Sequence, residues 1–212
     1  MDFHYTYIIM AFGLVLTGHF INLIAFTSLI IIHEFGHVIT ATIYKYRIKK
    51  ITIYPYGGIT EFDTLVNTKI EKDLLIAISG IIFQSIYFYT IFFLYRNGII
   101  REYTYNLFFT YHNSMLLFNV LPIIPLDGSK IINLIFSKYL NLNFSNNLTV
   151  LISFITLSMI LIGGIYEKNY SMVMVVFILL QNIWNYYKKI EYIYNKFVLE
   201  RYLYNIKYKS VK

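Results

Sequence analysis

The stretch from Tyr7 to Tyr44 most strongly constrains how this chain can fold. It contains no Lys or Arg, and Glu34 is its only acidic residue. As one helix it would extend about 57 Å, nearly twice the hydrocarbon thickness of a bilayer. The stretch must therefore fold back once. The sequence TGHFIN, Thr17 to Asn22, predicts where, because Gly and Asn tolerate tight turns. Two membrane spans follow from this.

The rest of the sequence is similarly apolar. Hydrophobic residues make up 58% of the 212 residues and charged residues 14%, whereas a soluble domain has about 25% charged residues. Further apolar runs predict spans at Leu74–Tyr95, Tyr105–Leu121, Leu148–Tyr166 and Ser171–Tyr187. The N-terminus lacks the positive start of a removable signal peptide, so we expect it to be retained. We predict an all-α integral membrane protein with about six transmembrane helices.

A segment of different character separates the second and third spans. The sequence YRIKKITIYPYGGITEF begins with a cationic cluster and continues as an alternating run that contains Pro55 and the pair Gly57-Gly58. Alternation indicates a strand, and Pro and Gly mark turns. We expect a small membrane-associated β-hairpin or a re-entrant loop here.

Positive charges are unevenly divided between the two sides of such a bundle. The side that holds the N-terminus carries fifteen of the 18 Lys and Arg residues, and the other side carries Arg96, Arg101 and Lys168. Because Lys and Arg collect in cytoplasmic loops, we expect both termini in the cytoplasm. The same rule explains the net charge of +7 without nucleic acid, which is not an expected partner.

We divide the chain into a six-span domain, residues 1–187, and a basic cytoplasmic tail, residues 188–212. The tail carries seven basic and two acidic residues with interleaved Tyr. This composition suits a helix lying on the anionic surface of the lipid bilayer. A truncated linker to a lost domain explains it equally well.

The second span contains the sequence HEFGH, which matches the H-E-x-x-H pattern. On a helix, His33 and His37 lie on one face, about 6 Å apart at Cβ, and both imidazoles can bind one zinc ion. Glu34 can then take a proton from a zinc-bound water. The alternative is two histidines that hydrogen-bond neighbouring helices around a buried Glu. The cost of burying three such residues in a membrane argues against that alternative.

A catalytic zinc ion takes three protein ligands and keeps one open position. The chain has no Cys, so the third ligand must be His, Asp or Glu. Asp127, in the sequence LPIIPLDG, is the leading candidate because two prolines break the helix before it. A simple helix-ending turn at the membrane surface is the alternative for this sequence. The competing ligands are His4, His19 and His112.

HEFGH and the later sequence NVLPIIPLDG together resemble the site-2 protease family of intramembrane zinc metalloproteases. The short chain, six spans and YPYGG hairpin are most similar to its sporulation members. The resemblance implies one zinc ion per chain, with His33, His37 and Asp127 as ligands and Glu34 as catalytic acid/base. It also implies substrate contacts by Asn119 and by the hairpin, whose candidate residues are Tyr56, Gly57 and Gly58.

The resemblance further implies a membrane-associated protein substrate, namely the pro-sequence of the sporulation sigma factor pro-sigma-K. It places the protein in the outer forespore membrane of a sporulating bacterium, with regulatory membrane proteins as partners. Many family members carry a nucleotide-sensing CBS domain. Only 28 residues follow Trp184, so we expect no such domain in this chain.

Two other functions are consistent with the same cluster of side chains. A metal-ion transporter could use His33, His37 and Asp127 as a transit site, but no second band of acids crosses the spans and no internal repeat is present. A catalytically inactive membrane scaffold would need only the fold. The intact Glu34 disfavours a scaffold, so we expect regulated intramembrane proteolysis.

Overall fold

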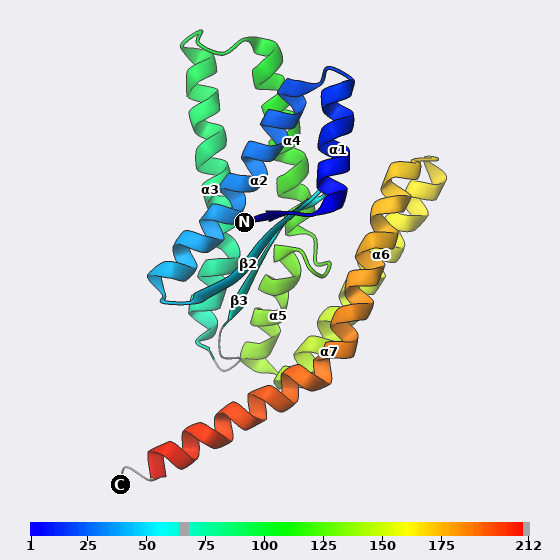
Figure 1. The fold of residues 1–212 in the computed structure, drawn as a ribbon. Helices are drawn as coiled ribbons and strands as arrows, with labels where there is room; N and C mark the ends of the chain where they lie inside the picture. Colours follow the sequence, from blue (N-terminus) through cyan, green and yellow to red (C-terminus); the bar gives the residue numbers. More distant parts are fainter. Residues whose placement is uncertain (64–67, 210–212) are drawn as a thin grey trace. The chain divides into compact units, whose positions relative to one another are not determined.

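The first two helices form an antiparallel pair. The computed structural model describes residues 1–63 and 68–209 (Figure 1). In it, α1 (Tyr5–Leu16) is followed by α2 (Phe20–Ile43). Between them Gly18 has a φ of 76°, and the His19 N–H donates to the Leu14 carbonyl at 2.8 Å. A glycine in the left-handed conformation ends a helix without steric cost. The predicted turn is confirmed.

A three-stranded sheet packs beside α2. Its strands are β1 (Asp2–Phe3), β2 (Arg47–Tyr54) and β3 (Gly57–Asp63), in the order β1-β2-β3. β2 and β3 are antiparallel and form the predicted hairpin, with Tyr54 opposite Gly57. β1 pairs in parallel with β2 and was not predicted, because two residues are too short to show a pattern. This pairing brings the N-terminus and the hairpin to the same end of the α1–α2 pair.

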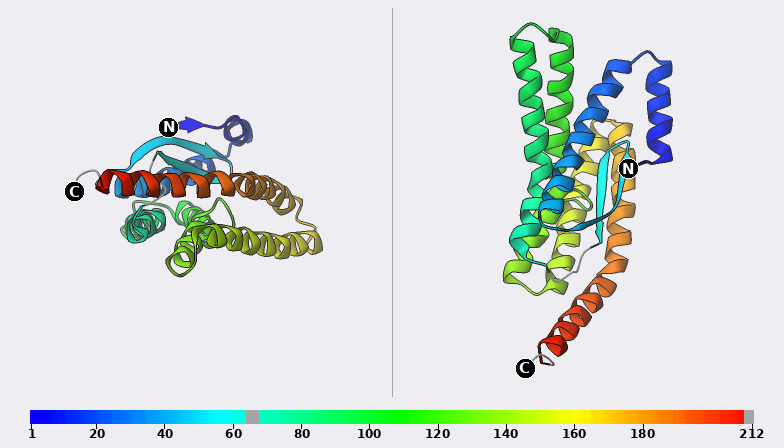
Figure 2. Two further views of the ribbon diagram at one scale, coloured as in Figure 1. Left: turned by 90° about the horizontal axis from the view of Figure 1, so that it is seen from below. Right: turned by 60° about the vertical axis from the view of Figure 1, so that its left-hand side comes forward.

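The chain divides into two compact units. The first unit comprises Met1–Asp63 and Leu75–Asn119, and the second comprises Thr64–Leu74 and Val120–Lys212. The first unit is completed by most of α3 (Ile70–Arg96) and of α4 (Glu102–Val120). These two helices run side by side (Figure 2) and are joined by stacked rings, among them Tyr95 on Tyr105. Its apolar core includes Leu29, Ile30 and Ile53.

The larger segment of the second unit begins where two prolines follow α4. Pro122 and Pro125 occupy the break, and α5 (Asp127–Tyr139) follows them. α6 (Leu142–Tyr166) and α7 (Tyr170–Lys209) then run alongside each other (Figure 1). The break was predicted, but α5 was not. α7 continues without interruption from the predicted last span into the basic tail.

Three of the described helices are long and apolar enough, by length and composition, to cross a bilayer. They are α2, α3 and α6. α1 is also apolar but has only 12 residues. The predicted span Tyr105–Leu121 corresponds to α4 within a few residues, and the predicted span Ser171–Tyr187 corresponds to the first part of α7, which continues to Lys209. The mostly helical fold is confirmed, and the count of six spans stays a prediction.

Candidate metal centre

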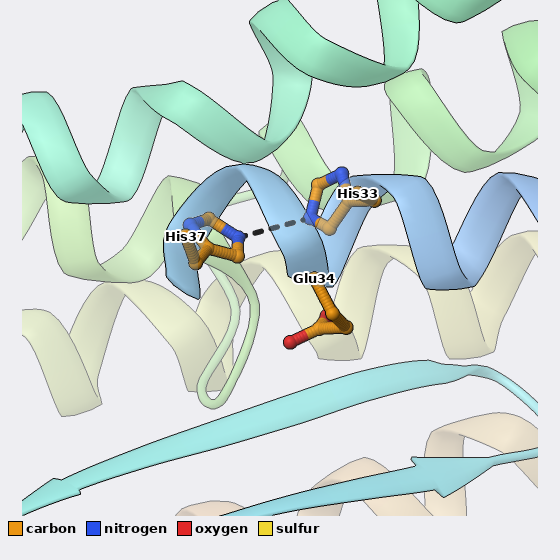
Figure 3. A group of neighbouring side chains, drawn as sticks. All are labelled: His33, Glu34 and His37. Carbon is orange, nitrogen blue, oxygen red and sulfur yellow. Dashed lines mark hydrogen bonds between the residues drawn. The ribbon is translucent and has the colours of Figure 1, made fainter. Parts of the chain in front are cut away.

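Three ionisable side chains meet on one face of α2. His33, Glu34 and His37 are all buried, with at most 3% of each residue exposed. Their ligand atoms lie within 4.8 Å of one another, and His33 Nε2 is 3.2 Å from His37 Nε2 (Figure 3). The four-residue spacing of the histidines puts both rings on the same side of the helix. The spacing therefore predicted this cluster correctly.

The hydrogen bonds of the two rings determine which nitrogens carry protons. His37 Nδ1 lies 2.7 Å from the carbonyl oxygen of Ile76, and His33 Nδ1 lies 3.1 Å from Gln84 Oε1. Both partners are acceptors, so each ring, when neutral, donates from Nδ1 and keeps its lone pair on Nε2. These lone pairs converge on one point. Two accepting nitrogens that face each other repel, and a cation between them relieves the repulsion.

Gly80 on α3 lets the rings fit between the two helices. A Cβ at this position would collide with the imidazole of His37 and approach His33 Cε1 to 2.8 Å. Gly36 on α2 has the same function toward the Ser79 carbonyl, which a Cβ would approach to 2.6 Å. Small residues let helices approach closely in membranes. Gly36 and Gly80 therefore allow the metal-binding face of α2 to be buried against α3.

Glu34 points away from the two rings and toward the sheet (Figure 3). Thr60 of β3 donates its hydroxyl hydrogen to Glu34 Oε2 at 2.5 Å. Gly58 lies against the same carboxylate, since a Cβ there would overlap its Cγ and Cδ atoms. Residues two apart on a strand face the same side, so Gly58 and Thr60 both contact the Glu34 side chain.

The donor set fits a zinc ion. It includes the two imidazole nitrogens, and the Glu34 carboxylate lies beside them without being counted as a ligand. Imidazole ligands that donate their second N–H to a carbonyl or amide oxygen are the usual arrangement in protein metal sites. His33 and His37 could therefore hold the metal.

Comparisons with known proteins identify the family. Residues 21–107 match the family model of peptidase family M50. The chain is 31% identical over 200 residues to stage IV sporulation protein FB of Bacillus subtilis, an alignment that covers 93% of this chain and 69% of that protein. The chain belongs to peptidase family M50, the site-2 proteases. It is accordingly an integral membrane protein of a metalloprotease family.

Two further similarities agree with this assignment. A zinc metalloprotease of Methanocaldococcus jannaschii is 27% identical over 149 residues, which are 69% of this chain and 43% of that protein. The solved structure of a site-2 protease from the same organism superposes with a TM-score of 0.70 at 23% identity, and covers 86% of this chain and 88% of that one. The superposition shows that the two chains share the fold.

The other predicted site residues lie near the ends of their elements. Asp127 is the first residue of α5, is 3% exposed and pairs with Lys130 Nζ at 2.9 Å. Asn119 lies in the last turn of α4 and is partly buried. Gly57 begins β3 with a φ of 145°, and the Tyr56 ring stacks on Tyr54. Asp127 and Asn119 belong to different units, and their roles in this M50 peptidase are proposals.

The competing histidines have other partners. His4 caps the start of α1, and His19 Nδ1 lies 2.9 Å from the Thr17 carbonyl in the turn. His112 bonds to Gln84, which stands between it and His33. Sequence analysis did not predict a role for Gln84, Thr60 or Gly80. A buried amide in the apolar run Leu74–Tyr95 was the signal that could have identified Gln84.

Proposed function

We propose that this M50 peptidase is a zinc endopeptidase that cleaves a membrane-associated protein within or next to the bilayer. His33, His37 and Asp127 hold one zinc ion per chain, and Glu34 is the general acid/base. The observation that carries the proposal is the pair of converging Nε2 atoms with the Glu34 carboxylate seated beside them.

The residues divide the chemistry between them. Bound zinc polarises the scissile carbonyl and lowers the pKa of a water molecule. Glu34 takes the proton of the attacking water and later delivers it to the leaving amine. Thr60 donates to Oε2 and so leaves Oε1 to handle the proton. Burial of the carboxylate excludes competing water molecules.

The sheet supplies a surface for the substrate. A transmembrane helix hides its carbonyls in its own hydrogen bonds, so the substrate must unwind before it is cleaved. Among the described strands β3 pairs only with β2, so its other edge has no strand partner, and an extended substrate could pair there. Gly58 and Thr60 of this strand contact Glu34. A substrate paired to β3, near Tyr56 and Gly57 and contacted by Asn119, would lie beside the catalytic carboxylate.

The sporulation relative supports a specific substrate and location. We propose the pro-sequence of pro-sigma-K as the substrate, regulatory membrane proteins as partners and the outer forespore membrane as the site of action. Six spans, with both termini in the cytoplasm, would form the protease domain of residues 1–187. The basic tail of residues 188–212 would then lie on the cytoplasmic side.

The substitution Glu34→Gln tests the proposal. It keeps size and polarity but removes the basic carboxylate, so cleavage should fall by at least about a hundredfold. Zinc content should be unchanged, because Glu34 is not a proposed ligand. The measurement is cleavage of a membrane-embedded substrate by purified protein, with zinc quantified in the same samples.

A matched control is Glu102→Gln, an exposed residue in the first turn of α4, which should cleave at the wild-type rate. A Glu34→Gln protein that cleaves nearly as fast as wild type would refute the mechanism. A metal transporter or an inactive scaffold would be unaffected by the substitution in transport or assembly. A loss of cleavage therefore also separates the protease from these two functions.

A further inference from the structure

Gln84 connects the metal centre to α4, a helix that supplies none of the proposed ligands. It lies on α3 and is fully buried in an apolar helix. Its Oε1 is 3.1 Å from His33 Nδ1, and its Nε2 is 3.1 Å from both His112 Nδ1 and the His112 carbonyl oxygen. A buried amide is costly unless it is hydrogen-bonded. Here three of its four bonding positions are used.

The His112 carbonyl determines which way the amide points. A carbonyl oxygen can only accept, so the amide nitrogen of Gln84 must face it and the amide oxygen must face His33. The reversed amide would bring two oxygens together and lose the hydrogen bond from Gln84 to the His112 carbonyl. His112 itself is held by the ring of Phe88, which stacks on it at 4.4 Å with an interplanar angle of 5°.

This orientation determines the tautomer of His33. Because Gln84 presents an oxygen, His33 Nδ1 carries the proton, and Nε2 keeps its lone pair toward His37. His37 needs no such side chain, since a backbone carbonyl, that of Ile76, holds its Nδ1. Of the two histidines, His33 therefore depends on a side chain that can be replaced.

We infer that Gln84 is a positioning residue of the metal centre, which holds His33 in the Nδ1–H tautomer, and that His112 sets the direction of the Gln84 amide. The inference rests on the proposed function in one respect, that His33 is a metal ligand. It makes α4 a part of the metal centre without giving it a ligand. His112, which competed for the third ligand position in the sequence, acts instead through Gln84.

The first test is made on metal-free protein. Histidine labelled with ¹⁵N reports the protonated ring nitrogen by NMR, and the His33→Ala spectrum identifies the His33 signals. Wild-type His33 should carry its proton on Nδ1, and Gln84→Leu should remove this preference. A wild-type His33 with its proton on Nε2 would overturn the inference, whether or not any variant folds.

The second test is zinc affinity, measured by competition with a chelator. Loss of such a supporting hydrogen bond lowers metal affinity by about 10- to 100-fold, and we expect this for Gln84→Leu. The matched control Gln181→Leu, an exposed position on α7, should bind zinc as wild type does. Equal affinities of Gln84→Leu and wild type would refute the inference.

His112→Leu should weaken zinc binding less than Gln84→Leu. It removes the acceptor Nδ1 but keeps the backbone carbonyl, which still orients the amide. An equal or larger loss in His112→Leu would show that packing, not amide orientation, is responsible. Undiminished zinc in His33→Ala would refute the proposed ligand instead, so the failure of the inference and that of the proposed function are distinguishable.

Discussion

Thr60 determines how Glu34 presents its carboxylate. The hydroxyl holds Oε2, and Gly58 leaves room for the rest of the side chain. A hydrogen bond to a charged group contributes about 1.5 to 3 kcal/mol. The bond costs little to form, because the strand already places Thr60 toward α2. The orientation of the catalytic group thus depends on a residue of the sheet.

We predict that Thr60→Val lowers cleavage about tenfold or more while zinc content stays the same. Valine keeps the shape of threonine but cannot donate a hydrogen bond. The Glu34 carboxylate then becomes mobile and is less well aligned with the attacking water molecule. The measurement is the cleavage rate of purified variants, with zinc analysis. Thr90→Val, an exposed threonine that bonds only within α3, is the control. Full activity in Thr60→Val would show that the sheet does not position Glu34.

Residues of the cluster differ in how far sequence could predict them. His33, Glu34 and His37 follow from a spacing within one helix turn, because i and i+4 always share a face. Gln84 and Thr60 come from elements far along the chain. Their contacts depend on how helices and strands pack, and no local pattern encodes this.

At the scale of elements, the contact between α2 and α3 depends on glycines, which carry no side chain. Gly36 and Gly80 face the opposite helix where any Cβ would collide. The two imidazoles therefore occupy the space that ordinary side chains would fill. The close approach of the two helices and the burial of the two imidazoles therefore depend on the same glycine, Gly80.

We predict that Gly80→Ala removes zinc and activity together. The added methyl group meets both imidazole rings, so either the rings or the helices must shift, at a cost of about 1 to 3 kcal/mol. Zinc analysis and thermal unfolding measure both effects. Gly163→Ala makes the same change on α6, where nothing lies within 4 Å, and should be neutral or stabilising by up to about 1 kcal/mol. Equal zinc in the two variants would contradict the packing argument.

The positions of the apolar helices were predicted, but α6 begins earlier than predicted, at Leu142, and α7 continues past the predicted Tyr187 to Lys209. Helix ends at Gly18 and before Pro122 follow from backbone chemistry that acts locally. α5 was missed because Lys130, Asn133 and Lys138 interrupt its apolar character. β1 exists only because β2 offers an edge to pair with, and such pairing is tertiary information.

At the scale of the whole molecule, the prediction concerns the zinc content of the protein. We predict about one zinc ion per chain and its loss in Asp127→Ala, since a catalytic site needs three protein ligands. Metal analysis of purified protein measures this. Asp2→Ala, an exposed aspartate paired with Lys50, is the control. Undiminished zinc in Asp127→Ala would exclude Asp127 as a ligand.

The orientation of the helix bundle in the membrane is a separate prediction. Fifteen of the 18 basic residues lie on the side of the N-terminus if six spans are present. Reporter fusions at the C-terminus should therefore be cytoplasmic, and fusions near Asn97, in the α3–α4 connection, should be exported. The opposite result would invert the topology and expose the KYRIKK sequence on the wrong side.

The sequence by itself determined what acts locally or along one element. Apolar runs determined the helices, turn residues their ends, and the four-residue spacing the His-Glu-His cluster, because each depends on neighbours within a few residues. Only the tertiary structure decided that α3 approaches through Gly80, that Thr60 seats Glu34 and that Gln84 orients His33. These contacts join residues from 26 to 51 positions apart. Chains bring such residues together only when whole faces pack, so no short pattern records them.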